Sequence, residues 1–241
     1  MKSINRTSTS TAVLTAFSII LVQIVRADST PIDISGLVNS DLTTYSGGGN
    51  YPQHGGVLTV NGVAFNLATI GQGADTAVIQ SSPNDGVAQT YSIPIGLFGV
   101  TSAYTLINSA FGDCNQNIGE LDFIGSSTTV QYLLTEGTNV RDHFDGSFCN
   151  MVTNIAGTAY FGGGMDRLDM QSVDLTALGS QTLQRIDFKS YGDGWGGAPF
   201  LAALTLDAPA DPPGDPVPEP RLFPLALIGL LVVVKAVSRF L

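Results

Sequence analysis

Residues 186–206 read IDFKSYGDGWGGAPFLAALTL and predict two β-strands joined by a glycine-rich turn. In the first half, Ile186 and Phe188 alternate with polar neighbours, and a period of two with one apolar face is typical of a half-buried strand. The stretch Gly192-Asp193-Gly194 indicates the turn. The second half predicts one inward-facing apolar row, formed by Phe200, Ala202, Leu204 and Leu206.

The same alternation recurs elsewhere in residues 28–207, for example in segments 63–68 and 129–134. In segment 168–171, Leu168 and Met170 face one way and the polar residues Asp169 and Gln171 face the other. Turn sequences separate these segments, and no convincing helical period exceeds two turns. About ten short strands without crossover helices predict an all-β domain, an antiparallel β-sandwich of the jelly-roll type.

Composition supports a folded domain and argues against one class of partner. Of 241 residues, 44% are hydrophobic and 12% are charged, which is too apolar for a disordered chain. All 20 acidic residues lie between Asp28 and Glu219, whereas that interval holds only four of the ten basic residues, so its net charge is 4 minus 20, or minus 16. Such an acidic surface repels phosphate backbones, and we expect no nucleic-acid binding.

The N-terminus has the layout of a secretory signal peptide. Lys2 and Arg6 precede an apolar run over residues 12–25, and small residues precede a cleavage position after Ala27. We therefore predict a signal helix in residues 1–27 and a mature chain that begins near Asp28. A retained membrane anchor is the alternative, although the apolar run is short for a membrane span of about 20 residues.

The C-terminus resembles a known sorting signal. A Pro-rich linker, residues 208–216, precedes the motif Val217-Pro218-Glu219-Pro220, an apolar run and a basic end with Lys235 and Arg239. This order of parts resembles the PEP-CTERM signal of exosortase substrates in residues 217–241, with a transmembrane helix at about 222–237. The resemblance implies an inner-membrane precursor that the secretion machinery and exosortase process near the Pro-Glu-Pro motif. The product would reach the cell surface or the extracellular matrix of a bacterium that makes exopolysaccharide.

The domain between these ends resembles a type that recurs on PEP-CTERM proteins and, more loosely, the galactose-binding-like jelly rolls. The segments that carry this resemblance are 104–112, 137–143, 167–171 and 199–203. It implies a fold and a surface location, and it identifies no binding site.

Cys114 and Cys149 are the only two cysteines. In an exported chain we expect them to form a disulfide, because they lack the Cys-x-x-Cys spacing of redox and metal sites. The bridge would draw Asp113 and the segment Arg141-Asp-His-Phe-Asp145 to one end of the domain. There, Asp142 and His143 are candidates to bind sugar hydroxyls, and Asp113, Asp142 and Asp145 are candidates to bind calcium. The alternative is an Arg141–Asp142 ion pair with solvated neighbours.

Aromatic residues in glycine-rich stretches are the other candidates for a sugar site. Trp195, with Tyr191 and Asp193, lies in the turn between the two strands quoted first, where an exposed ring could stack on a sugar face. The alternative is a tryptophan buried in the core. Tyr45, Tyr51 and His54 form a second, weaker set of candidates.

The sequence favours a non-catalytic function. It contains no Gly-x-Ser-x-Gly, His-Glu-x-x-His or P-loop motif, and Glu120 and Glu136 are the only glutamates of the domain. We expect no cofactor other than calcium. Three functional hypotheses remain: an exported protein that binds exopolysaccharide, a structural or adhesive envelope protein without a small-ligand site, and a secreted hydrolase.

Overall fold

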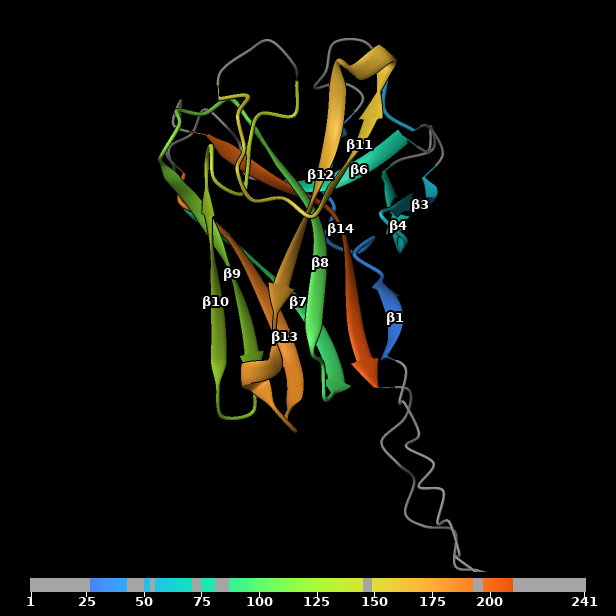
Figure 1. Ribbon diagram of the computed structural model, residues 1–241, viewed down its shortest axis with the longest axis vertical. Coiled ribbons are helices and arrows are strands. Elements are labelled where there is room, and N and C mark those ends of the chain that lie inside the picture. The colour runs from blue at the N-terminus through green and yellow to red at the C-terminus, as the bar shows by residue number, and fades with distance from the viewer. Residues whose placement is uncertain are drawn as a thin grey trace, which may run out of the picture.

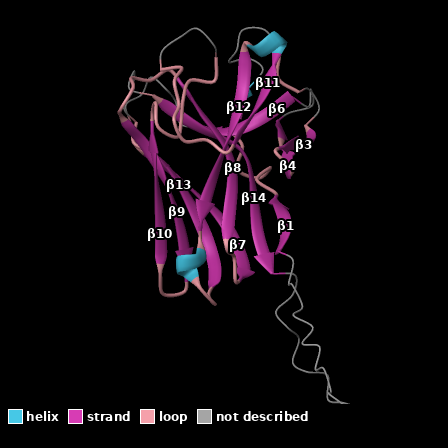
Figure 2. Cartoon of the chain, in the orientation of Figure 1, coloured by secondary structure: helices cyan, strands magenta, loops and turns pink. Residues whose placement is uncertain are grey.

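The computed structural model describes residues 27–42, 50–52, 55–70, 75–80, 87–144, 149–192 and 197–209. Strands dominate this part of the chain, and its helical segments are short, for example the 3-10 helices η1 (Gly162–Gly164) and η2 (Thr176–Leu178) (Figure 2). The named strands pair antiparallel throughout. The predicted all-β class is therefore confirmed.

The larger sheet has eight strands. Its main order is β11 (Gly157–Phe161), β12 (Asp166–Asp174), β8 (Ser102–Ala110), β14 (Ala198–Pro209), β6 (Asp75–Gln80) and β2 (Ser40–Asp41). Two more strands join it at the sides, β1 (Ala27–Ile32) on β14 and β5 (Thr69–Ile70) on β6. Because Ala27 pairs with Pro209, the two ends of the described chain lie side by side (Figure 1).

The smaller sheet has four strands, in the order β10 (Thr129–Thr135), β9 (Asn117–Gly125), β13 (Thr182–Ser190) and β7 (Gln89–Phe98). Figure 1 shows β9, β10 and β13 on one side of the molecule and β14 and β1 on the other. One apolar cluster contains residues of both sheets, such as Phe123 and Phe188 from the smaller sheet and Ile107 and Leu204 from the larger. The two sheets therefore share a hydrophobic core, and its burial stabilises their association.

The opposite face of the larger sheet is also covered. The hairpin of β3 (Gly56–Val60) and β4 (Val63–Leu67) packs there, with β4 against β14 and β1. A second apolar cluster joins Phe65 of this hairpin to Phe200 of β14 and Leu168 of β12. Strand β14, in the middle of the larger sheet, is thus buried on both faces.

The burial of both faces of β14 shows that one prediction from the sequence is wrong in part. Leu204 and Leu206 belong to the core between the sheets, as does Leu201, whereas Phe200 and Ala202 belong to the second cluster. A register shift between Leu201 and Ala203 inserts one residue into β14, and such a bulge moves side chains to the other face. The single inward row predicted for residues 200–206 is therefore wrong in its first half.

The predicted terminal segments lie outside the described residues, including the signal helix, the motif Val217-Pro218-Glu219-Pro220 and the helix at about 222–237. In the part of the chain that the structure does describe, no helix has the length and hydrophobicity that crossing a membrane requires.

Candidate functional site

The predicted disulfide is confirmed. Cys114 and Cys149 are bonded, with their Cα atoms 5.2 Å apart. The bond joins the loop between β8 and β9 to the segment that precedes β11. As expected, the segment around Asp142 lies at this end: the Ser109 N–H donates to the Arg141 carbonyl at 3.1 Å, and the His143 N–H donates to the Ser109 carbonyl at 3.0 Å.

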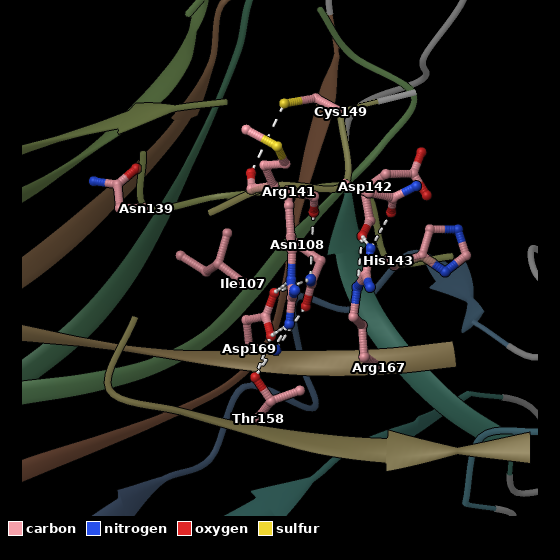
Figure 3. A network of polar contacts seen from close by, with 12 residues as sticks. Ile107, Asn108, Asn139, Arg141, Asp142, His143, Cys149, Thr158, Arg167 and Asp169 are labelled. Carbon is pink, nitrogen blue, oxygen red and sulfur yellow. Dashed lines mark hydrogen bonds and ion pairs between the residues drawn. The ribbon is translucent and has the colours of Figure 1, made fainter. Parts of the chain in front are cut away.

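Arg141 pairs with Asp169 of β12, and not with Asp142 as the alternative from the sequence supposed. Its Nε and Nη2 donate to the two carboxylate oxygens of Asp169 at 2.7 and 2.9 Å. Asn108 and Thr158 also donate to this carboxylate, at 2.9 and 2.6 Å (Figure 3). Asp169 is fully buried, so these four hydrogen bonds replace the water that it has lost.

The carboxylate of Asp142 accepts hydrogen bonds from two backbone N–H groups. Its Oδ2 accepts from the Phe111 N–H at 2.9 Å, and its Oδ1 accepts from the Phe144 N–H at 2.7 Å. The guanidinium of Arg167 donates to its carbonyl at 3.0 and 2.9 Å. Since Asp142 is 2% exposed, it is not the solvated neighbour of an ion pair. These contacts fix the loop that carries it.

His143 is an interior residue. It is 5% exposed, its Nδ1 lies 2.8 Å from the Tyr51 hydroxyl, and its ring meets Phe200 edge-on at 5.6 Å. Burial lowers the pKa of His143 to about 4, and the positive charge of Arg167 adds to this effect. The imidazole is therefore neutral at pH 7.

Tyr51 does not have the exposed position that its glycine-rich surroundings suggested, because it is 2% exposed and packs in the second apolar cluster. The other weaker candidates, Tyr45 and His54, lie outside the described residues, as do Asp145, Asp193 and Trp195.

Asp113 is exposed beside the disulfide. Within the described ranges, no group of three or more His, Cys, Asp or Glu side chains is arranged to hold a metal ion. Calcium binding stays a prediction.

Tyr191 reaches the side of the smaller sheet that faces away from the core. Its hydroxyl donates to Glu120 Oε2 of β9 at 2.8 Å, and Gln131 of β10 donates to the same oxygen at 2.6 Å. Lys189 of β13 donates to Glu120 Oε1 at 2.6 Å and to Asp122 Oδ2 at 2.5 Å. We call this surface the outer polar face, and with its neighbours on β7 and β13 it consists of Ser92, Glu120, Asp122, Gln131, Asp187, Lys189 and Tyr191.

The register of the strands explains this gathering. Lys189 lies directly opposite Glu120, and Asp187 lies opposite both Asp122 on one side and Ser92 on the other. Ser92 donates to Asp187 Oδ1 at 2.7 Å. Cross-strand neighbours on one face of a sheet interact in this way. The outer polar face is therefore continuous across all four strands.

Hydrogen bonds within the outer polar face help to set the protonation states of its side chains. Burial alone would raise the pKa of Glu120, but the hydrogen bonds from Lys189 and Tyr191 outweigh it and hold this pKa below its usual value. The hydrogen bonds to Asp122 and Glu120 raise the pKa of Lys189. Burial and the bond to Glu120 raise the pKa of Tyr191 to about 12. At pH 7 the carboxylate is ionised, the amine is protonated and the phenol is neutral.

Apolar surface accompanies these polar groups. Leu133 of β10 lies opposite Glu120 and is 42% exposed, and Tyr191 is half-buried. The sequence identified Tyr191 as a candidate and placed Asp187 and Lys189 on the polar side of a strand. It named Glu120 only as one of the two glutamates of the domain, and it did not single out Asp122 or Gln131, because their partners lie on other strands.

No family model matches this chain, and a comparison with curated proteins finds none that matches its sequence.

Proposed function

We propose that this protein is an exported bacterial envelope protein, sorted by exosortase, whose non-catalytic jelly-roll domain binds exopolysaccharide through the outer polar face. The observation that carries the binding proposal is the continuous outer polar face, which includes the half-buried residue Tyr191. Calcium is the one cofactor that we retain as a candidate.

The order of strands supports the jelly roll. Four central strands of the larger sheet run β6-β14-β8-β12, and the smaller sheet runs β7-β13-β9-β10. Along the chain, the connections β7 to β8, β8 to β9, β12 to β13 and β13 to β14 each pass from one sheet to the other. Two interlocked Greek keys of eight strands have this arrangement.

The chemistry of the outer polar face supports a sugar ligand. Sugars present both hydroxyl groups and apolar C–H faces, so a site for them needs directional hydrogen-bonding groups next to apolar surface. Glu120, Gln131 and Lys189 offer a carboxylate, an amide and an ammonium group within hydrogen-bond distance of one another. Tyr191 and Leu133 supply the apolar surface beside them.

The protonation states support binding without catalysis. Hydrolysis of a glycosidic bond needs an acid with a raised pKa that can reach the substrate, together with a second carboxylate. Glu120 has a lowered pKa on the outer polar face, and Glu136, which has a raised pKa, is completely buried. These two glutamates therefore do not form such a pair.

Support for export comes from the disulfide and from the ends of the sequence. A disulfide persists in oxidising compartments, and Cys114–Cys149 is compatible with one. The segments that resemble a signal peptide and a PEP-CTERM signal indicate the route of export.

Binding is tested with the exopolysaccharide of the producing cells and the variant Tyr191→Ala. We expect the variant to bind at least about tenfold more weakly, as for a central aromatic contact, while its melting temperature changes little. Tyr160→Ala is the control, because Tyr160 is 59% exposed on β11 of the other sheet. Equal affinity of Tyr191→Ala and the unaltered protein in titration calorimetry would remove the outer polar face from the proposal.

A structural or adhesive envelope protein is the second candidate. The buried network around Asp169 favours it, since those charged groups bond one another inside the domain and not an external ligand. If the unaltered protein binds no glycan on an array and no exopolysaccharide, this second function replaces the first.

A further inference from the structure

Glu136 is a buried acid that none of the functions above uses. It follows β10 directly, its exposed fraction is 0%, and neither carboxyl oxygen has a hydrogen-bond partner in the described structure. Its backbone is held on both sides, because its N–H donates to the Gln116 carbonyl at 2.9 Å and its carbonyl accepts from the Asn115 N–H at 2.8 Å. The Ser109 hydroxyl lies close enough to lower the pKa of this acid, but it donates its proton to the Phe111 carbonyl.

Two glycines pack against the carboxyl group. Gly112 and Gly197 have positive φ angles of 134° and 128°. A Cβ atom at Gly112 would collide with Glu136 Oε1, and one at Gly197 would lie 3.2 Å from the same oxygen and 2.9 Å from Ile118 Cγ2. The carboxyl group thus lies where the loop between β8 and β9 meets the start of β14. We call this place the glycine junction.

Among the described residues, no positive charge contributes to the pKa of Glu136. The segment 141–144 contributes Asp142, whose negative charge opposes ionisation. Strand β8 contributes Ser109, whose hydroxyl donates to the Phe111 carbonyl at 2.9 Å. Strand β9 contributes Ile118, and Gly197 directly precedes β14. Burying an unpaired carboxylate is costly, so such a group normally takes up a proton.

We propose that Glu136 is a proton-dependent latch, whose neutral carboxyl group closes the glycine junction and whose ionisation in alkaline solution opens it. Opening separates Gly112 and Gly197 from the carboxylate and admits water to it. The Cys114–Cys149 bond lies beside Glu136, since a Cβ at Gly137 would be 3.2 Å from Cys149 Sγ. The opening is therefore local, because the disulfide still ties the loop between β8 and β9 to the segment that precedes β11.

The direction of the pH effect follows from proton linkage. Burial raises the pKa of Glu136 from 4.5 to about 8; the Ser109 hydroxyl opposes this increase and Asp142 adds to it. Between these values the folded state holds a proton that the unfolded state has lost. The stability from the neutral carboxyl is complete below about pH 4.5 and is lost as the pH rises through about 8. In that window the folding equilibrium constant falls up to about tenfold per pH unit.

The test compares the full chain in detergent solution with its variant Glu136→Gln, which keeps the shape of the side chain and cannot ionise. Denaturation curves from about pH 6.5 to 9, above the range in which His143 has the opposite effect, should show the fall for the unaltered chain and its absence for Glu136→Gln. Glu120→Gln is the control and should keep the fall, because Glu120 has a lowered pKa. At pH 9, the Asn115 amide should exchange hydrogen at least tenfold faster in the unaltered chain than in Glu136→Gln.

Two outcomes would overturn the latch. Equal pH dependence of the unaltered chain and Glu136→Gln would show that another group titrates. If added calcium abolished the decrease in stability with rising pH, a cation, and not a proton, would neutralise the carboxylate. A carbon NMR titration of the unaltered chain decides the matter even if Glu136→Gln does not fold: the Glu136 carboxyl should titrate near pH 8, and titration near pH 4.5 contradicts the proposal.

Discussion

At the scale of single residues, the interior contains an ion pair that stabilises the fold only when both partners are present. Arg141 and Asp169 form a two-bond ion pair with side-chain exposures of 12% and 0%. Asn108 and Thr158 complete the hydrogen bonding of the carboxylate. Removal of one partner of a buried pair leaves the other charge without compensation, and this loss is larger than the net stabilisation that the pair supplies.

We therefore expect Arg141→Ala to lower the free energy of unfolding by about 3–5 kcal/mol. The control is Arg185→Ala, since Arg185 pairs with Asp187 at 3.2 Å but its side chain is 48% exposed. Exposed pairs contribute about 0–1 kcal/mol. Urea denaturation of both variants measures the difference, and losses of equal size would contradict the structural role given to Asp169.

These residues also show what a sequence can predict. The alternation of Leu168 and Met170 with Asp169 and Gln171 placed the polar pair on the other side of the strand. It did not show that this side is buried, because the partners Asn108 and Arg141 lie 61 and 28 positions away along the chain. Cys114 and Cys149 were predictable because only one pairing of two cysteines exists.

At the scale of strands, the alternation of apolar and polar residues was predictable from the sequence, but the bulge that interrupts it was not. The alternating segment at 129–134 became β10 with the expected inner side, because Val130, Tyr132 and Leu134 all contact the core. In β14 the bulge between Leu201 and Ala203 exchanges the two faces, and a single apolar strand with both faces buried carries no signal of such a shift.

Close approach of β9 and β13 gives a prediction for Gly119. A Cβ at this glycine would collide with the Lys189 carbonyl and would lie 3.2 Å from Pro199 Cγ. We expect Gly119→Ala to destabilise the protein by about 1–3 kcal/mol, as overpacking does. Gly36→Ala is the control, since a Cβ there meets no atom within 4 Å. Thermal unfolding measures both, and an unchanged melting temperature for Gly119→Ala would contradict the strand spacing.

At the scale of the whole molecule, the proposed route of export makes a prediction about topology. Basic residues flank an acidic domain at both ends of the sequence, and from the positive-inside rule we expect Lys235 and Arg239 to stay in the cytoplasm. A reporter fused after Leu241 should therefore be cytoplasmic in a host without exosortase. A periplasmic reporter would refute the sorting-signal interpretation of residues 217–241.

The location of polysaccharide binding is the most direct test of the proposed function. Hydrogen exchange measured by mass spectrometry, with and without the exopolysaccharide of the producing cells, locates the bound surface. We predict slower exchange in β9, β10 and β13, which carry the outer polar face, and unchanged exchange in β11 and β12 of the other sheet. Slower exchange confined to β11 and β12, or no change at saturating polysaccharide, would contradict the proposal.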